Sequence, residues 1–442
     1  MKPSNLRISL DILSKAPDKK GSVQDIYRID LENQRKKALL CRTTDSGSVF
    51  DVGTIFTVPQ SGMLRTIIRH FIYTGLGDAN TWKGISEDDV KECYLDESIR
   101  EDLLSHSLFS MLKENGVLTH HIGMADRKTG IIHSKGLPEN PSNLVVVEEL
   151  PVFKPKRFKL WNRYGWDYND YIKEPRKVIA LENIFRLGCP GGSSLLQRYN
   201  SVLNEGGIKK AHNYLQSIGL SETPAPWKQF SNMLYDFTTK YEPQDRQLLW
   251  QEAMHISGVS AEVYGNLIRI LTYCTIYTYK FFKELGFKLW DLKWEAGVDG
   301  DTIMIVDTMD PDSVRVTGET VYNNRKWCIH FNKQAIRDYY RIIHEKWYNA
   351  VNDAKNRSKN DLQGRDFLQI YREGVKNGDY PDIPKYDEYF VEIQCEKYAL
   401  MAAPLMKGTN THDELQRVML KEIDFYKKAS KLDKFMEINA LT

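Results

Sequence analysis

Alternating hydrophobic patterns predict strands in the first third of the chain. The stretch "GSVQDIYRID" (21–30) alternates apolar and polar residues, and "KALLCRT" (37–43) follows after a polar turn, which predicts an antiparallel hairpin. The stretch "SNLVVVEELPVF" (142–153) contains the continuous apolar run Val145–Val147. Such a run indicates a strand that is buried on both faces.

Helical spacing of apolar residues dominates the rest of the chain. It predicts helices over 62–76 and over 332–351. It also predicts a helix over 259–286 that is apolar on nearly all sides, which indicates that this helix is buried, and Gly286 would end it. The region from about 161 to 241 is rich in aromatic residues, glycine and proline, and it predicts loops with short helices.

A second hairpin is predicted late in the chain. The strands "FKLWDLKWEAG" (287–297) and "DTIMIVDT" (301–308) are joined by "VDGD", an Asp-Gly turn that favours a hairpin. Strands therefore come first, then mixed elements and then helices. This order favours an α+β fold over a doubly wound parallel sheet.

Composition narrows the class of protein. The chain has 442 residues, a formal net charge of +2 and six widely separated cysteines. A balanced charge argues against nucleic acid and anionic lipid as partners, and no apolar run is long enough to span a membrane. The N-terminus does not resemble a secretory signal, and scattered thiols favour a reducing compartment. We therefore expect a cytoplasmic protein without a membrane partner.

The late hairpin could carry chemistry. Alternation places Asp291, Lys293 and Glu295 on one face of the first strand, and a short turn would bring Asp307, at the end of the second strand, close to Glu295. Two carboxylates beside a lysine suit Mg²⁺ bound to a triphosphate. The alternative interpretation is an exposed ladder of charges across the two strands.

The next segment, "DTMDPDSVRV" (307–316), gathers acids, a serine and an arginine just beyond a buried strand. Asp-Pro-Asp-Ser is good turn chemistry, because Asp and Ser bond their own backbone and Pro presets φ. A solvated turn and a functional strand end are both open on these residues alone.

Several motifs, in a common order, resemble the SAICAR synthetase family, ATP-dependent ligases of purine biosynthesis. "WDLKWEAG" resembles the family's "ADTKFEFG", "DTMDPDSVR" resembles "DEVLTPDSSR", and "TTDSGSVFDV" resembles "TDRISAFDV". "FTTK" is similar to "TPTTK", and "FNKQAIRD" to "DKQVRD". "VVVEELPVFKPKRF" is similar to the family's strand "PIEVVVRGY", which would place Arg157 on its arginine.

The resemblance implies a small antiparallel lobe over ATP, residues 1–145, and a larger lobe, 146–442, for metal and substrates. It implies the cofactors ATP and Mg²⁺, and as substrates carboxyaminoimidazole ribonucleotide (CAIR) and L-aspartate, which would be joined through an acyl phosphate. A homo-oligomer is possible.

The resemblance also implies site residues, which fall into three groups. Glu295 and Asp307 would be the carboxylates that bind Mg²⁺–ATP. The catalytic lysines beside the nucleotide would be Lys240 and Lys293. Arg157 and Arg315 would bind the phosphate of the ribonucleotide. Asp312 and Ser313 would contact its ribose or carboxylate end. Ser48 and Asp51 would lie beside the same cleft.

The chain departs from the family pattern in five places, two of which are Ser61 for the lysine of "PGKG" and Asn332 for the aspartate of "DKQ". Ser22 and Gln24 replace two basic residues of the opening hairpin, and "YEPQDR" replaces an "HDE" segment, leaving Asp245 as a partial substitute. "FKLWNRYGW" (158–166) stands where the family has a glycine-serine segment, so a phosphate contact would pass to Lys159 or Arg163. These changes leave open a related ligase with a different amine or nucleotide, or a nucleotide- or nucleic-acid-binding protein without turnover.

Three further segments allow more than one interpretation. The aromatic and basic segment that starts at Phe158 could pack over the active site as an insertion, or could stack single-stranded bases. "CPGGSS" (189–194) lacks the ending of a phosphate-binding loop and is interpreted as a flexible loop over the cleft. His120 and His121 have no acid or cysteine at ligand spacing, so hydrogen bonding is favoured over metal binding.

Overall fold

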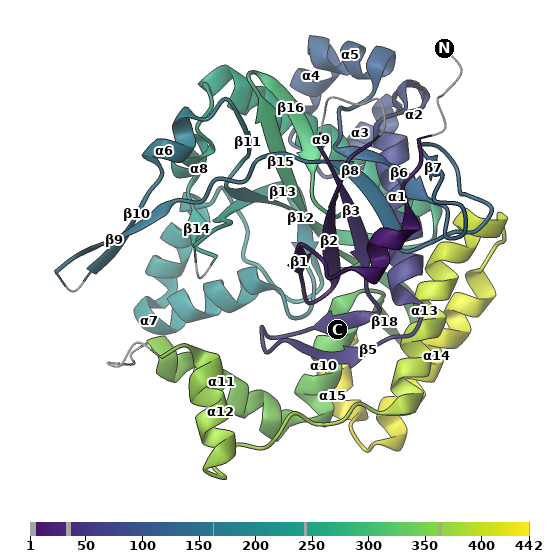
Figure 1. The fold of residues 1–442 in the computed structure, drawn as a ribbon. Coiled ribbons are helices and arrows are strands. Elements are labelled where there is room, and N and C mark those ends of the chain that lie inside the picture. The colour runs from purple at the N-terminus through teal and green to yellow at the C-terminus, as the bar shows by residue number, and fades with distance from the viewer. Residues whose placement is uncertain are drawn as a thin grey trace.

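Two large antiparallel sheets, two short ribbons and helices along the whole chain form the structure, which confirms the α+β prediction (Figure 1). The computed structural model describes residues 6–31, 37–161, 163–242, 245–359, 361 and 365–441. The turn expected between the first two strands includes residues 32–36, which lie outside the described residues, as do Pro243 and Gln244 of the "YEPQDR" segment.

The first sheet has six strands, in the order β1-β2-β3-β8-β6-β7. They are β1 (Lys19–Lys20), β2 (Gln24–Ile29), β3 (Ala38–Thr43), β8 (Leu144–Glu148), β6 (His121–Ala125) and β7 (Ile132–His133). The predicted hairpin corresponds to β2 and β3, with Tyr27 opposite Leu40. The run Val145–Val147 is buried on both faces, as expected, because Val146 packs in one cluster and Val145 and Val147 pack in another. The expected lobe boundary after residue 145 falls inside β8, so this sheet extends to Glu148.

The second sheet is built around the long strand β15. Its main path runs β14-β13-β12-β15-β17-β18, and β11 and β16 also pair with β15. The strands are β11 (Arg176–Val178), β12 (Leu181–Cys189), β13 (Lys228–Thr239), β14 (Gln247–Leu248), β15 (Lys288–Asp299), β16 (Thr302–Val306), β17 (Val314–Tyr322) and β18 (Arg325–His330). The predicted late hairpin is confirmed as β15 and β16, with Gly300 at a φ of 59° in its turn.

Two short ribbons stand apart from these sheets. They are β4 (Ser46–Ser48) with β5 (Thr54–Thr57), and β9 (Lys156–Leu160) with β10 (Arg163–Asp167). The second ribbon projects from the body of the molecule at the left of Figure 1.

Helices cover both sheets and form the C-terminal part. Those before β15 are the 3-10 helix Leu10–Ser14, α1 (Ser61–Leu76), α2 (Ala79–Lys83), α3 (Glu87–Lys91), α4 (Glu97–Ser105), α5 (Ser107–Asn115), α6 (Asn169–Lys173), α7 (Ser194–Ser217), α8 (Trp250–Ser257) and α9 (Ala261–Glu284). Those after β18 are α10 (Lys333–Ile343), α11 (Glu345–Lys359), α12 (Phe367–Lys376), α13 (Glu388–Lys407), α14 (His412–Lys428) and α15 (Leu432–Asn439). Among the described residues, none of these helices is both long and apolar enough to cross a membrane.

The buried helix α9 packs on β15. Leu292 and Trp294 of β15 face the core, and the Trp294 Nε1–H donates to Thr275 Oγ1 of α9 at 2.9 Å. Asp291, Lys293 and Glu295 occupy the alternate positions of β15, so their side chains point away from α9, as the pattern predicts. Gly286, at a φ of 84°, follows the helix end and reverses the chain into β15.

Two predictions about elements were wrong. The region 161–241 contains β10 to β13 and the helix α7, which is broken by a kink at Gly207, where loops with short helices were expected. Its strands gain their order from pairing with β15, which is remote in sequence, and local composition does not show that pairing. The single helix expected over 332–351 is two helices, because His344 leaves helical geometry with φ −112° and ψ 44°.

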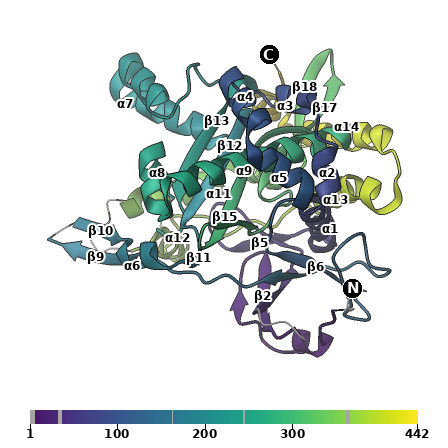
Figure 2. The same ribbon diagram turned by 90° about the horizontal axis from the view of Figure 1, so that it is seen from above.

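A short bridge joins the two sheets. Thr119 pairs with Ile305 of β16, and the backbone N–H of His120 donates to the Ile305 carbonyl at 2.9 Å. The Glu148 N–H of β8 in turn donates to the His120 carbonyl at 2.7 Å. Figure 2 shows strands β2 and β6 of the first sheet on one side of the body that contains the second sheet. The bridge therefore ties the first sheet to the strand that ends at Asp307.

Candidate active site

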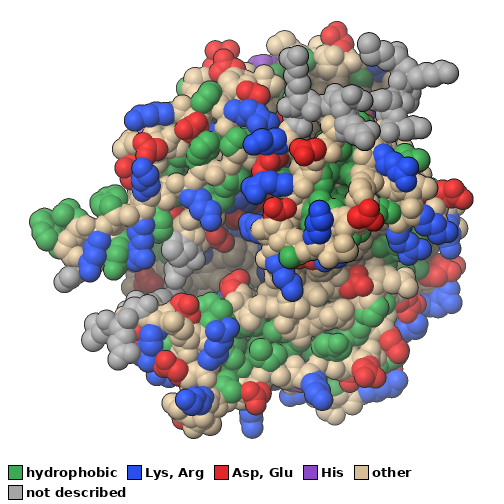
Figure 3. Space-filling view, in the orientation of Figure 1, with side chains coloured by type: hydrophobic (Ala, Val, Ile, Leu, Met, Phe, Trp, Pro, Cys, Tyr) green, Lys and Arg blue, Asp and Glu red, His purple; other side chains and the backbone are tan. Residues whose placement is uncertain are grey.

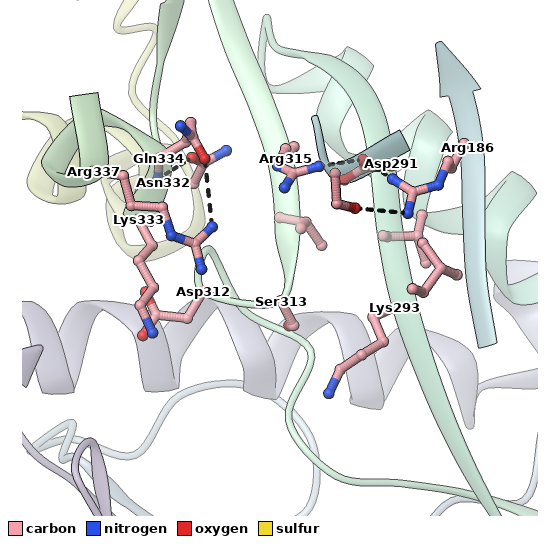
Figure 4. Close-up of a pocket in the computed structure, with 14 residues that line it drawn as sticks. Arg186, Asp291, Lys293, Asp312, Ser313, Arg315, Asn332, Lys333, Gln334 and Arg337 are labelled. Atoms are coloured by element: carbon pink, nitrogen blue, oxygen red, sulfur yellow. Dashed lines mark hydrogen bonds and ion pairs between the residues drawn. The ribbon is translucent and has the colours of Figure 1, made fainter. Parts of the chain in front are cut away.

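A cavity of about 170 Å³ opens where β12, β15 and β17 meet the start of α10. Its charged lining residues are Arg186, Lys293, Arg315, Lys333, Arg337, Asp291 and Asp312 (Figure 4). Five cations against two carboxylates give the cavity a net positive charge. The N-terminus of α10, with Asn332 as its cap, adds the positive end of a helix dipole. The cavity is suited to an anionic ligand such as a phosphate.

Buried carboxylates hold two of these arginines in place. Asp291 lies between Arg186 and Arg315 in Figure 4, with Oδ2 at 3.0 Å from Arg186 Nη1 and at 2.6 Å from Arg315 Nη1. Arg186 also pairs with Asp236 at 2.8 Å, and its Nη2 donates to Ser194 Oγ at 3.2 Å. Arg315 retains 18% of its side-chain exposure, whereas Arg186 retains 1%. Arg315 is therefore the more accessible of the two to a ligand.

The segment 307–316 forms a turn, and several of its residues line the cavity. Ser313 Oγ accepts from the Asp310 N–H at 2.9 Å, and the Asp312 N–H donates to Asp310 Oδ1 at 2.8 Å, which is the expected turn chemistry. Asp312 instead lines the cavity and pairs with Arg65 of α1 at 2.5 Å. Burial raises the pKa of Asp310 to about 6, although Arg65 acts in the opposite direction. The turn chemistry is confirmed, but the turn is buried at Asp310 and is not solvated, and a functional role for the segment stays a prediction.

A second cluster of charges lies beside the cavity, where β15 pairs with the end of β16. Glu295 is 2% exposed, and both Lys240 and Lys293 contact its carboxylate, Lys293 at 2.8 Å. Lys293 also pairs with Glu182 of β12 at 2.6 Å. Glu295 lies opposite Val306, the residue before Asp307, and the Asp307 charge acts on the Glu295 carboxyl, so the structure brings together all four residues expected around Mg²⁺–ATP.

Burial and neighbouring charges shift the pKa values of this cluster. Burial and the neighbouring Asp307 carboxylate raise the pKa of Glu295. Burial alone would also raise the pKa of Asp307, but Lys240 lowers it below its ordinary value. Burial alone would lower the pKa of Lys293, which Glu295 and Glu182 raise above its ordinary value. The pKa values of the two carboxyls are therefore shifted in opposite directions in the same buried surroundings.

Three of the six residues expected at the substrate do not line the cavity. Arg157 is exposed on β9, where its guanidinium carbon lies 3.7 Å from the centre of the Tyr164 ring. Ser48 ends β4, and the exposed Asp51 pairs with Lys355 of α11 at 2.7 Å. The charge of Asp51 still acts on Lys333, whose pKa is lowered by burial and raised by Asp312 and Asp51. Asp51 therefore remains beside the cavity, whereas Arg157 does not.

The aromatic and basic insertion also differs from the prediction. Every residue of β9 is exposed, and Trp161 at the tip of the ribbon is 83% exposed. In Figure 3 the ribbon projects with hydrophobic and basic side chains on its surface. It does not pack over the cavity, because no residue of β9 or β10 is among the described residues that line it.

The family model for SAICAR synthetase matches residues 99–354, which is more than half of the chain. The chain belongs to the SAICAR synthetase family.

Relatives of this SAICAR synthetase family member carry the corresponding name. A candidate phosphoribosylaminoimidazole-succinocarboxamide synthase of Archaeoglobus fulgidus is 28% identical over 250 residues, 56% of this chain and 66% of that protein. The synthase of Thermoplasma volcanium is 26% identical over 246 residues, 55% of this chain and 70% of that protein. The SAICAR synthase of Saccharomyces cerevisiae, solved with SAICAR, covers 92% of this chain and 99% of its own, at 17% identity and a TM-score of 0.48.

The cavity corrects the position of the family's arginine. In the family pattern a strand "PIEVVVRGY" precedes a glycine-serine segment, and "LENIFRLGCPGGSS" (181–194) has the same order of a strand, an arginine and glycines with serines. Arg186 and Ser194 of this stretch line the cavity, and "CPGGSS" connects β12 to α7. Arg186, and not Arg157, therefore lies at the cavity.

Three further cavity residues were missed although their motif was found. Lys333, Gln334 and Arg337 come from "FNKQAIRD" and project from the first turns of α10. Helical spacing places residues 333, 334 and 337 on one face, so this motif could have identified them.

The carboxylate pair Glu295 and Asp307 could hold a metal ion. Within the described ranges, no group of three or more His, Cys, Asp or Glu residues is arranged to hold one. His121 instead bonds His70, with 2.9 Å between the ring nitrogens. The pair Glu295 and Asp307 fits Mg²⁺, which takes one or two protein carboxylates together with phosphate oxygens.

Proposed function

We propose that this protein is an ATP-dependent ligase that joins L-aspartate to CAIR and gives SAICAR, ADP and phosphate. The observation that carries the proposal is the adjacency, in a member of this family, of an arginine-rich cavity and the Glu295–Asp307 pair. The cavity suits the ribonucleotide phosphate, and the carboxylates with their lysines suit Mg²⁺–ATP. Lys293 lines the cavity and also contacts Glu295, so it belongs to both parts.

The proposed reaction has two steps. A CAIR carboxylate oxygen attacks the γ-phosphorus of ATP, ADP leaves, and an acyl phosphate forms. The aspartate amine then attacks the carbonyl carbon, phosphate leaves, and the amide bond forms. Glu295 and Asp307 would hold Mg²⁺, which neutralises phosphoryl charge.

The side chains of the cavity would act by position and charge. Arg186 and Arg315 would grip the phosphate of the ribonucleotide, because planar guanidinium groups match such oxyanions. Asp312 and Ser313 would contact its ribose or carboxylate end. Lys240 and Lys293 would stabilise charge on the phosphates of ATP.

The direct test uses the purified chain with CAIR, ATP, Mg²⁺ and L-aspartate. We expect ADP and SAICAR in equal amounts. A coupled assay would measure ADP, and absorbance would measure SAICAR. Omitting L-aspartate should remove SAICAR. ADP that forms only with another amine or nucleotide would retain the reaction class and refute the substrates.

The second candidate is a nucleotide-binding protein without turnover. The opening hairpin favours this candidate, because Ser22 and Gln24 stand where the family has basic residues. Ser22 is exposed and Gln24 is half-buried. Calorimetry with Mg²⁺–ATP separates the two candidates. Tight binding without ADP formation in any substrate mixture would support the second, and steady turnover would eliminate it.

A pH dependence follows from the raised pKa of Glu295 in the metal-free protein. Where Glu295 is protonated, Mg²⁺ must displace that proton to bind both carboxylates. Mg²⁺ affinity should therefore fall as the pH is lowered through this raised pKa and rise as the pH increases. Calorimetry in buffers of different ionisation enthalpy should detect the released proton. An affinity that does not rise with pH would contradict the carboxylate assignment.

A further inference from the structure

Asp307 has an unusual backbone conformation. It follows β16 with a φ of 68°, in the left-handed region that residues other than glycine adopt infrequently. Aspartate tolerates this region better than most residues, but the conformation persists only where the surroundings determine it. The conformation is of interest because the Asp307 side chain is one half of the carboxylate pair.

Three buried side chains converge on the Asp307 backbone carbonyl. Its oxygen lies 2.8 Å from Tyr73 Oη, 3.0 Å from His120 Nε2 and 3.3 Å from Arg69 Nη2. A carbonyl oxygen can only accept, so each of the three groups donates, and His120 carries a proton on Nε2. Tyr73 and Arg69 are 1% exposed and His120 is 8% exposed.

The donors come from a different part of the molecule than the carboxylates. Arg69 and Tyr73 lie on α1, which packs against the first sheet, and His120 lies in the bridge that joins the sheets. Glu295 and Asp307 belong to the second sheet. The Tyr73 hydroxyl also lies 2.9 Å from the Val306 carbonyl, so it contacts two consecutive peptide groups at the strand end.

We propose that Tyr73, His120 and Arg69 are positioning residues that hold Asp307 in its left-handed conformation and so aim its carboxylate at the metal site. This inference rests on the proposed function. With the carbonyl fixed toward α1, the direction of the Cα–Cβ bond is fixed as well, and the side chain reaches Glu295. Loss of a donor would let the peptide turn and separate the two carboxylates.

The first variant is Tyr73→Phe, which removes only the hydroxyl and keeps the ring that stacks on His121. We expect the Mg²⁺ concentration for half-maximal response to rise by about 10-fold or more, as is typical when a partner of a metal ligand is lost. The readout is the rise in melting temperature with Mg²⁺ at fixed ATP, together with kcat at saturating Mg²⁺, which should change less. The matched control is Tyr264→Phe, because Tyr264 is equally buried and its hydroxyl has no partner among the described residues.

A second pair of variants keeps the proposal testable if Tyr73→Phe folds poorly. His120→Gln retains an N–H near the position of Nε2 and should keep the wild-type Mg²⁺ midpoint. His120→Leu removes the donor and should raise the midpoint. Equal midpoints in His120→Leu, Tyr73→Phe and the wild type would overturn the positioning role. A wild type without any Mg²⁺- and ATP-dependent response would instead refute the proposed function.

Discussion

Replacing Asp307 with asparagine is expected to lower turnover by at least about 100-fold, because changes in outer-shell partners alone cost 10- to 100-fold. The change removes a full negative charge from the proposed Mg²⁺ site but keeps the size of the side chain. Asparagine also tolerates the left-handed backbone conformation, so the fold should be retained. Steady-state kinetics at several Mg²⁺ concentrations would measure the loss.

Thermal melting distinguishes this metal role from that of a turn cap. The unliganded Asp307→Asn protein should melt close to the wild type, while its stabilisation by Mg²⁺–ATP should be largely lost. Asp301→Asn is the matched control, since Asp301 lies exposed at the other end of the same strand. An Asp307→Asn variant that keeps the full ligand-induced rise in melting temperature would exclude Asp307 as a metal ligand.

The carboxylate cluster was predictable because its geometry is local. Alternation along β15 and one short turn to β16 determine which side chains meet, and both features are visible in 20 residues. The same is true of the turn at Asp310 and Ser313. Where a site depends on one hairpin, the alternation of side chains along its strands and the residues of its turn are enough to predict the site.

The arginine of the cavity was not predictable in the same way. Arg157 and Arg186 both follow apolar stretches, and the sequence does not show which strand is central. β12 pairs on both sides, with β13 and with β15, whereas β9 pairs only with β10 in the described structure. Central pairing buries Arg186 against Asp236 and Asp291, and edge pairing leaves Arg157 in solvent.

Contacts between segments that are remote in sequence could not be predicted from the sequence either. Arg65 and Asp312 form an ion pair although 247 positions separate them. The approach of α1 to the end of β16 depends on the bridge between the two sheets, which no motif marks. The ligands of the site could thus be named from patterns, but the side chains that orient them could not.

Arg315 and Arg186 should respond differently to replacement by glutamine. Arg315 has one carboxylate partner and is partly exposed in the cavity, so Arg315→Gln should leave stability nearly unchanged. It should raise KM for CAIR by about 10- to 150-fold, the equivalent of the 1.5–3 kcal/mol typical of a hydrogen bond to a charged group. KM for ATP should change little, since the expected ATP contacts lie around Glu295.

Arg186→Gln should instead destabilise the fold. Arg186 is the buried partner of both Asp236 and Asp291, and removing one member of a buried ionic group costs about 3–5 kcal/mol. Denaturant unfolding would measure this loss. Arg198→Gln is the control for both variants, because Arg198 pairs with Asp236 but does not line the cavity. An Arg315→Gln variant in which KM rises for ATP and not for CAIR would show that the cavity binds the phosphates of ATP.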